Sequence, residues 1–135
     1  MPQLVAHIDF IGRQKQRDVL LLEFHNRETG FMLDYTANSS RKTILDWFDA
    51  NGIPYSPCGG YASETRLDSY RGQIYIDVPF DEADPLFRRV QEFLEHPDGT
   101  IKFEGAWFCY LPLDVCMENA YHDVPGFWED LMARF

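Results

Sequence analysis

The feature that most constrains the fold is the regular succession of strand-like and helix-like segments along the chain. In residues 73–80, apolar side chains such as Ile74 and Ile76 alternate with other residue types, which is typical of a strand with one buried face. Asp84 and Pro85 follow at once, and a capping carboxylate before a proline predicts the first turn of a helix. Strands and helices in this succession favour an α+β fold built on an antiparallel sheet.

The first third of the chain is predicted to be a meander of three antiparallel strands. Its segments are residues 5–11, 18–25 and 31–36, in which apolar side chains recur at every second position. Placing the apolar faces of the first hairpin on one side pairs Ile8 with Leu22, because a slip of one residue would expose a whole face.

The later elements are predicted from the same periodicities and from turn residues. They are a helix after residues 38–40 that ends at Asn51 and Gly52, the strand 73–80, the helix that begins at Asp84, a strand over 101–111, a helical segment over 114–121 and a short terminal helix over 128–135. Residues 54–72 are compatible with a short strand near Tyr61 or with a loop. We expect the helices to pack on one face of the sheet.

The element order is compatible with a ferredoxin-like β-α-β-β-α-β core, to which the N-terminal strand meander and a C-terminal helix are added. A length of 135 residues fits a single domain over 1–135. No apolar run approaches the ~20 residues that a membrane-spanning helix needs.

Charge is concentrated in the second half of the chain. The formal net charge is −10, and residues 77–135 hold 13 acidic and 4 basic side chains, a net charge of −9. Binding to nucleic acid or to an anionic membrane requires cationic surfaces, so neither is expected as a partner. A basic protein, or a second copy of this chain, is the kind of partner that remains.

Three cysteines, Cys58, Cys109 and Cys116, are too few and too scattered for a disulfide framework or a structural zinc site. We expect three free thiols, as in a cytoplasmic protein, with Cys109 buried between aromatic neighbours. No metal and no cofactor is expected.

One candidate ligand site follows from the predicted hairpin. In that register His7 faces Glu23, and His25 lies on the same face, so two imidazoles and a carboxylate would share one sheet surface. Such a set suits iron or zinc, but a solvated sheet surface is the favoured interpretation, because metal sites usually gather their ligands from more than one element. Cys58, directly before Gly59 and Gly60, is a candidate nucleophile if a base lowers its pKa, and a tight turn is the simpler interpretation.

A second candidate site combines acidic and aromatic residues. Asp81 and Glu82 lie where a strand passes into a helix, and Glu129 lies beside the aromatic residues Tyr121 and Trp128. Aromatic anchors surrounded by charge are typical of protein interfaces that attract a basic partner.

These observations predict a non-enzymatic, cytoplasmic protein-binding module, inhibitor-like or immunity-like, that uses its acidic second half. The alternative is a small-molecule or metal-binding protein, which includes an enzyme, that uses His7, Glu23 and His25 or the Cys58 loop.

Overall fold

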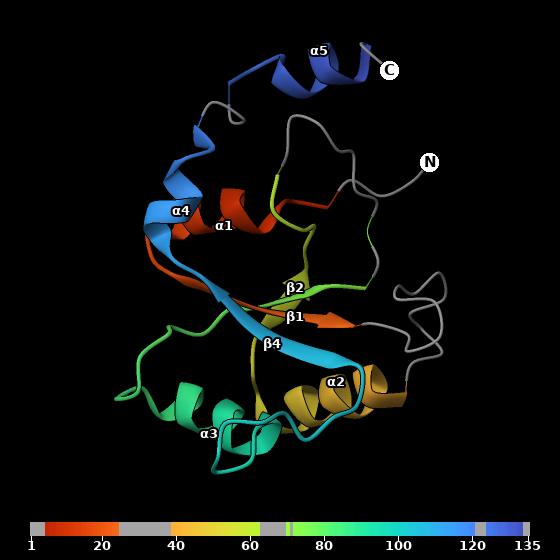
Figure 1. Cartoon of the computed structure of the whole chain (residues 1–135), viewed down its shortest axis with the longest axis vertical. Helices are drawn as coiled ribbons and strands as arrows, with labels where there is room; N and C mark the ends of the chain where they lie inside the picture. The colour runs from red at the N-terminus through yellow and green to blue at the C-terminus, as the bar shows by residue number, and fades with distance from the viewer. Residues whose placement is uncertain (1–4, 25–38, 63–69, 71, 121–123, 134–135) are drawn as a thin grey trace.

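The computed structural model describes residues 5–24, 39–62, 70, 72–120 and 124–133 (Figure 1). The described elements are α1 (Ile8–Lys15), β1 (Val19–Phe24), α2 (Ser39–Asn51), β2 (Tyr55–Pro57), β3 (Ile74–Ile76), α3 (Pro85–Leu94), β4 (Ala106–Leu111), α4 (Leu113–Met117) and α5 (Phe127–Ala133). The predicted strand over 31–36 lies outside the described residues.

The sheet has four strands in the order β2-β3-β1-β4, and every neighbouring pair is antiparallel. In this register Leu20 of β1 lies between Ile76 of β3 and Tyr110 of β4. The predicted α+β fold with an antiparallel sheet is therefore confirmed. The elements β1-α2-β2-β3-α3-β4 follow one another in the β-α-β-β-α-β order.

Helices cover both faces of this sheet, so the prediction that they gather on one face is wrong (Figure 1). On one face, Leu20 and Leu22 of β1 pack with buried residues of α2 and α3, among them Phe48 and Val90. On the other face, Leu21 packs with α1 and α4. A strand that is buried on both faces carries apolar residues on both of them, so its residues do not alternate between apolar and polar. Alternation alone therefore did not predict the second helical layer.

The N-terminal strand predicted over residues 5–11 is wrong, because Ile8–Lys15 is helix α1. β1 lies between β3 and β4 in the sheet, so it has no free edge at which residues 5–11 could pair. Ile8 and Ile11 are instead buried against the second face of the sheet. They are three residues apart, a spacing that places both on one side of a helix.

Two helix ends confirm the predicted capping. The Asp84 carboxylate accepts hydrogen bonds from the backbone N–H groups of Leu86 and Phe87, at 2.9 and 3.0 Å. Gly52 takes a left-handed φ of 69°, which lets the Ile53 N–H donate back to the Phe48 carbonyl at 3.0 Å.

The segment 54–72 begins with a strand that lies earlier than predicted. β2 spans Tyr55–Pro57, and the chain bends at Tyr61. The strand pairs with β3, where Ser56 lies opposite Tyr75. Within the described part of the chain, no helix is long and apolar enough to cross a membrane.

Candidate functional site

The predicted site of His7, Glu23 and His25 does not form as a hairpin face. His7 is the N-cap residue of α1, and Glu23 of β1 lies opposite Trp107 of β4. The cross-strand pairing of His7 with Glu23 is therefore wrong, since the two residues lie on different kinds of element. His25 lies outside the described residues.

A different contact nevertheless brings His7 close to the Cys58 loop. His7 and Gly59 form an isolated parallel bridge, in which the Gly59 N–H donates to the Ala6 carbonyl at 2.7 Å. The Ile8 N–H in turn donates to the Gly59 carbonyl at 3.2 Å. A Cβ added at Gly59 would lie 3.4 Å from the His7 ring, which is an ordinary van der Waals distance, so this contact does not by itself require glycine.

Cys58, which directly precedes Gly59, is fully buried, and this burial determines the reactivity of its thiol. Burial, and after it the negative charge of Glu23, raises the pKa of the Cys58 thiol to about 12. A thiol with that pKa is protonated at neutral pH and is a poor nucleophile. Among the described residues, no three His, Cys, Asp or Glu side chains are grouped to hold a metal ion.

The burial of the three thiols predicts the order in which a thiol reagent modifies them. All three cysteines are free, but Cys58 and Cys116 are buried while Cys109 is only half-buried, contrary to the expectation that Cys109 is the buried one. Burial raises the pKa of Cys116 too, to about 11. We therefore expect a thiol reagent at about pH 8 to modify Cys109 first, and Cys58 and Cys116 only after unfolding.

Mass mapping of the modified peptides over time measures this order. After denaturation without a reductant, all 3 thiols should react. Modification of Cys58 in the native protein as fast as Cys109 would contradict its burial, and a denatured count below 3 would reveal a bridge.

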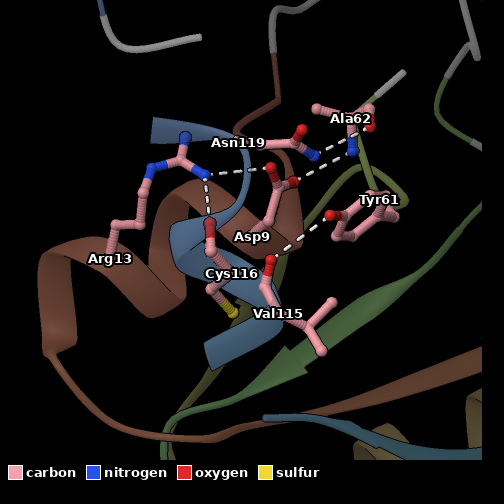
Figure 2. Close-up of polar contacts among 7 residues, drawn as sticks. All are labelled: Asp9, Arg13, Tyr61, Ala62, Val115, Cys116 and Asn119. Atoms are coloured by element: carbon pink, nitrogen blue, oxygen red, sulfur yellow. Dashed lines mark hydrogen bonds and ion pairs between the residues drawn. The ribbon is translucent and has the colours of Figure 1, made fainter. Parts of the chain in front are cut away.

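A buried ion pair between two residues of α1 was not predicted from the sequence (Figure 2). Asp9 is completely buried and its carboxylate accepts a hydrogen bond from the Arg13 guanidinium at 3.0 Å. The same Arg13 nitrogen donates to the Cys116 carbonyl of α4 at 2.8 Å. The spacing of four residues would have indicated this pair if the segment had been identified as helical.

The loop after β2 is hydrogen-bonded to the same ion pair and to α4. The second Asp9 oxygen accepts from the Ala62 N–H at 3.0 Å, and the Asn119 side chain donates to the Ala62 carbonyl at 3.1 Å. The Tyr61 hydroxyl donates to the Val115 carbonyl at 3.2 Å. We name these residues the α1–α4 polar cluster. Because its charged groups are buried and its hydrogen bonds join three segments, its geometry serves stability rather than substrate binding.

The acidic residues predicted at the start of α3 are exposed, as expected. Asp81 and Glu82 both face solvent, and the Asp81 carboxylate accepts from the Ala83 N–H at 2.9 Å. Glu129 of α5 is exposed too, but Figure 1 shows α5 and α3 at opposite ends of the molecule. The predicted acidic set is thus divided between two regions.

The aromatic residues beside Asp81 and Glu82 differ from the predicted ones. Phe80 and Tyr110 are 43% and 53% exposed, and their rings stack with centroids 4.6 Å apart. Sequence analysis missed this pair, because 30 residues separate its members. Of the predicted aromatic residues, Tyr121 lies outside the described residues and the side chain of Trp128 is not described. We name Phe80, Asp81, Glu82 and Tyr110 the acidic-aromatic patch.

A shallow hollow of about 410 Å³ lies at the end of α3, between His96 and Lys102. Among its lining residues, the Lys102 ammonium donates to the Glu92 carbonyl at 2.9 Å. The hollow therefore offers an exposed mixture of charges rather than an apolar pocket with convergent polar groups.

Comparison of the chain with protein-family models, with curated protein sequences and with solved structures finds no significant match.

Proposed function

We propose that this chain is a non-enzymatic protein-binding module, inhibitor-like or immunity-like, that binds a basic protein through its acidic second half. The observation that carries this proposal is the acidic-aromatic patch. The exposed rings of Phe80 and Tyr110 stack on each other, and two exposed carboxylates, Asp81 and Glu82, directly follow Phe80 in the sequence. Aromatic side chains supply large contact areas at interfaces, and flanking charge selects partners of opposite sign.

The patch is held in place by the fold, which favours a preformed binding surface. Phe80 contacts Phe87 of α3 edge-on, with ring centroids 5.3 Å apart, and Phe87 belongs to the buried core. The Asp84 cap, two residues after Glu82, fixes the start of α3. A surface that is ordered before binding loses less conformational entropy on association.

A reducing compartment is part of the proposal. The three free thiols fit the cytoplasm, where glutathione and thioredoxin keep cysteines reduced.

Charge reversal on the patch tests the proposal. We expect Asp81→Lys/Glu82→Lys to slow association with a basic partner by about tenfold at low salt, and to leave dissociation nearly unchanged, because rim charges act on encounter. The partner is first identified by native mass spectrometry of complexes purified from the protein's own host. Stopped-flow or surface plasmon resonance across a salt series then measures both rates.

The matched control is Asp46→Lys/Asp49→Lys, which changes the net charge equally at two exposed positions of α2. Glu129→Lys, measured alone, shows whether α5 contributes. Asp84 is left unchanged, because loss of this cap would cost about 1 kcal/mol of stability and confuse folding with binding. Equal association rates for wild type and the patch variant at low salt would limit the acidic surface to a role in solubility.

A further inference from the structure

The two rings of the acidic-aromatic patch differ in how much of each is already in contact. Phe80 touches two rings, because Tyr110 stacks on it and Phe87 meets it edge-on. Tyr110 stacks on Phe80 alone among the described aromatic rings, and it is 53% exposed. A residue that is stacked on one side and still more than half exposed has much of its remaining ring surface in water. Tyr110 can therefore accept a further planar group.

The carboxylates of the patch have no counter-charge within the described part of the chain. Asp81 and Glu82 are exposed, and the Asp81 carboxylate accepts only the Ala83 N–H among the described donors. Phe80 connects these charges to the ring pair, because its ring stacks on Tyr110 while its backbone leads directly to Asp81. The patch thus combines an open aromatic surface with two negative charges, which indicates a cationic ligand.

Another part of the same chain shows how arginine and lysine differ toward such groups. One Arg17 nitrogen donates both to the Tyr75 hydroxyl, at 3.2 Å, and to the Asp77 carboxylate, at 2.6 Å. Lys15 reaches the Asp77 carboxylate alone, at 3.5 Å. A tyrosine and a carboxylate together are therefore satisfied here by a guanidinium. The patch offers the same two types of group in Tyr110 and its carboxylates, and no arginine of the described residues contacts them.

The chemistry of the two basic side chains favours arginine over lysine at this surface. A guanidinium is planar and weakly hydrated, so it can lie flat on an aromatic ring while the N–H groups in its plane donate to a carboxylate. An ammonium is a compact and strongly hydrated point charge, so it gains from the carboxylates but less from the ring face. A surface that joins a ring to carboxylates therefore distinguishes between the two cations.

We propose that the acidic-aromatic patch recognises an arginine side chain of its basic partner. The guanidinium stacks on the open surface of the Tyr110 ring and donates to the carboxylate of Asp81 or Glu82. This inference rests on the proposed function and goes beyond it by naming the residue that the patch contacts. The ring selects arginine over lysine, whereas the carboxylates attract either cation.

Two peptides of equal length and charge test this selectivity. Each is capped at both ends and alternates glycine with a basic residue, which is arginine in one peptide and lysine in the other. NMR titration of the protein at low salt gives the Kd of each peptide. The arginine peptide should bind about two- to fivefold more tightly, because stacking at an exposed site adds a modest cation–π attraction.

Variants assign this preference to residues of the patch. Tyr110→Leu should remove the preference and leave the Kd of the lysine peptide nearly unchanged, and Tyr110→Val takes its place if circular dichroism shows that the first variant is unfolded. Trp107→Leu is the control, since it removes a similarly exposed ring of β4 outside the patch, and it should keep the preference. Asp81→Asn/Glu82→Gln should weaken binding of both peptides by a similar factor, because it removes the charges and keeps the rings.

The outcomes separate this inference from the proposed function. Equal affinities for the two peptides, both reduced by Asp81→Asn/Glu82→Gln, would overturn the selectivity for arginine and leave the proposed function in place. An arginine preference that survives Tyr110→Leu would overturn the inference too, because another surface would then be responsible for it. Binding of neither peptide, or binding that the carboxylates of the patch do not influence, would contradict the inference and the proposed function together.

Discussion

Gly12→Ala is expected to destabilise the protein by about 3 kcal/mol, although alanine is normally the better helix residue. Gly12 lies inside α1, and a Cβ added there would lie 2.3 Å from the Cys116 Sγ and 3.0 Å from the Cys116 Cβ. Cys116 is fully buried in α4, and rotating its sulfur away would still leave its Cβ in tight contact with the added Cβ. The backbone of one of the two helices must shift instead, and over-packing of this kind offsets the gain of about 0.5–1 kcal/mol in helix propensity.

Chemical denaturation measures the change, and thermal unfolding should show a loss of roughly 10 °C for a chain of this size. Gly60→Ala is the control, because an added Cβ there has no heavy atom within 4 Å, and its effect should stay within about 0.5 kcal/mol. Combining Gly12→Ala with Cys116→Ala removes the shorter of the two contacts and should recover part of the loss. Purely additive effects of the two substitutions would show that α1 and α4 do not touch at this point.

Removal of the buried carboxylate in Asp9→Ala is expected to cost about 3–5 kcal/mol, the range typical of breaking a buried ion pair from one side. The side chains of Asp9 and Arg13 are 0% and 5% exposed. The substitution leaves the guanidinium in a buried site without the Asp9 charge, and it removes the oxygen that accepts from the Ala62 N–H. Both effects carry desolvation costs that no new contact offsets.

The exposed pair of Lys42 and Asp46 provides a matched control, because it has the same spacing and the same 3.0 Å distance but side chains that are 74% and 65% exposed. Asp46→Ala should cost less than about 0.5 kcal/mol. Urea denaturation of the two variants gives the comparison. Similar losses for Asp9→Ala and Asp46→Ala would contradict the buried position of the first pair.

Local sequence determined the elements whose signals lie within a few residues. The cap at Asp84, the glycine stop at Gly52 and the apolar stripe of α2 each depend on neighbours within one or two helical turns, so they could be predicted without knowledge of the fold. The exposure of Asp81 and Glu82 was predictable for the same reason. Charged residues at a helix start stay in water unless an interaction with a partner offsets the cost of their desolvation.

Only the tertiary structure decided whether residues 5–11 form a strand or a helix. It therefore also decided the parts of the candidate sites that depend on these residues. Seven residues of alternating polarity fit a short strand, yet Ile8 and Ile11 also fit one side of a helix, and only the covered second face of the sheet selects between the two. The run of apolar residues from Val19 to Leu22 was the one local sign of that second face.

The contacts between distant segments could likewise not be predicted from the periodicity of the sequence. His7 meets Gly59 through a backbone bridge, and Phe80 meets Tyr110 through ring stacking, and neither contact leaves a pattern in the neighbouring residues. The sequence alone determined which segments form helices and strands where their signals were local. The tertiary structure decided which faces are buried and which side chains meet, because those outcomes depend on packing between segments that are not neighbours in the sequence.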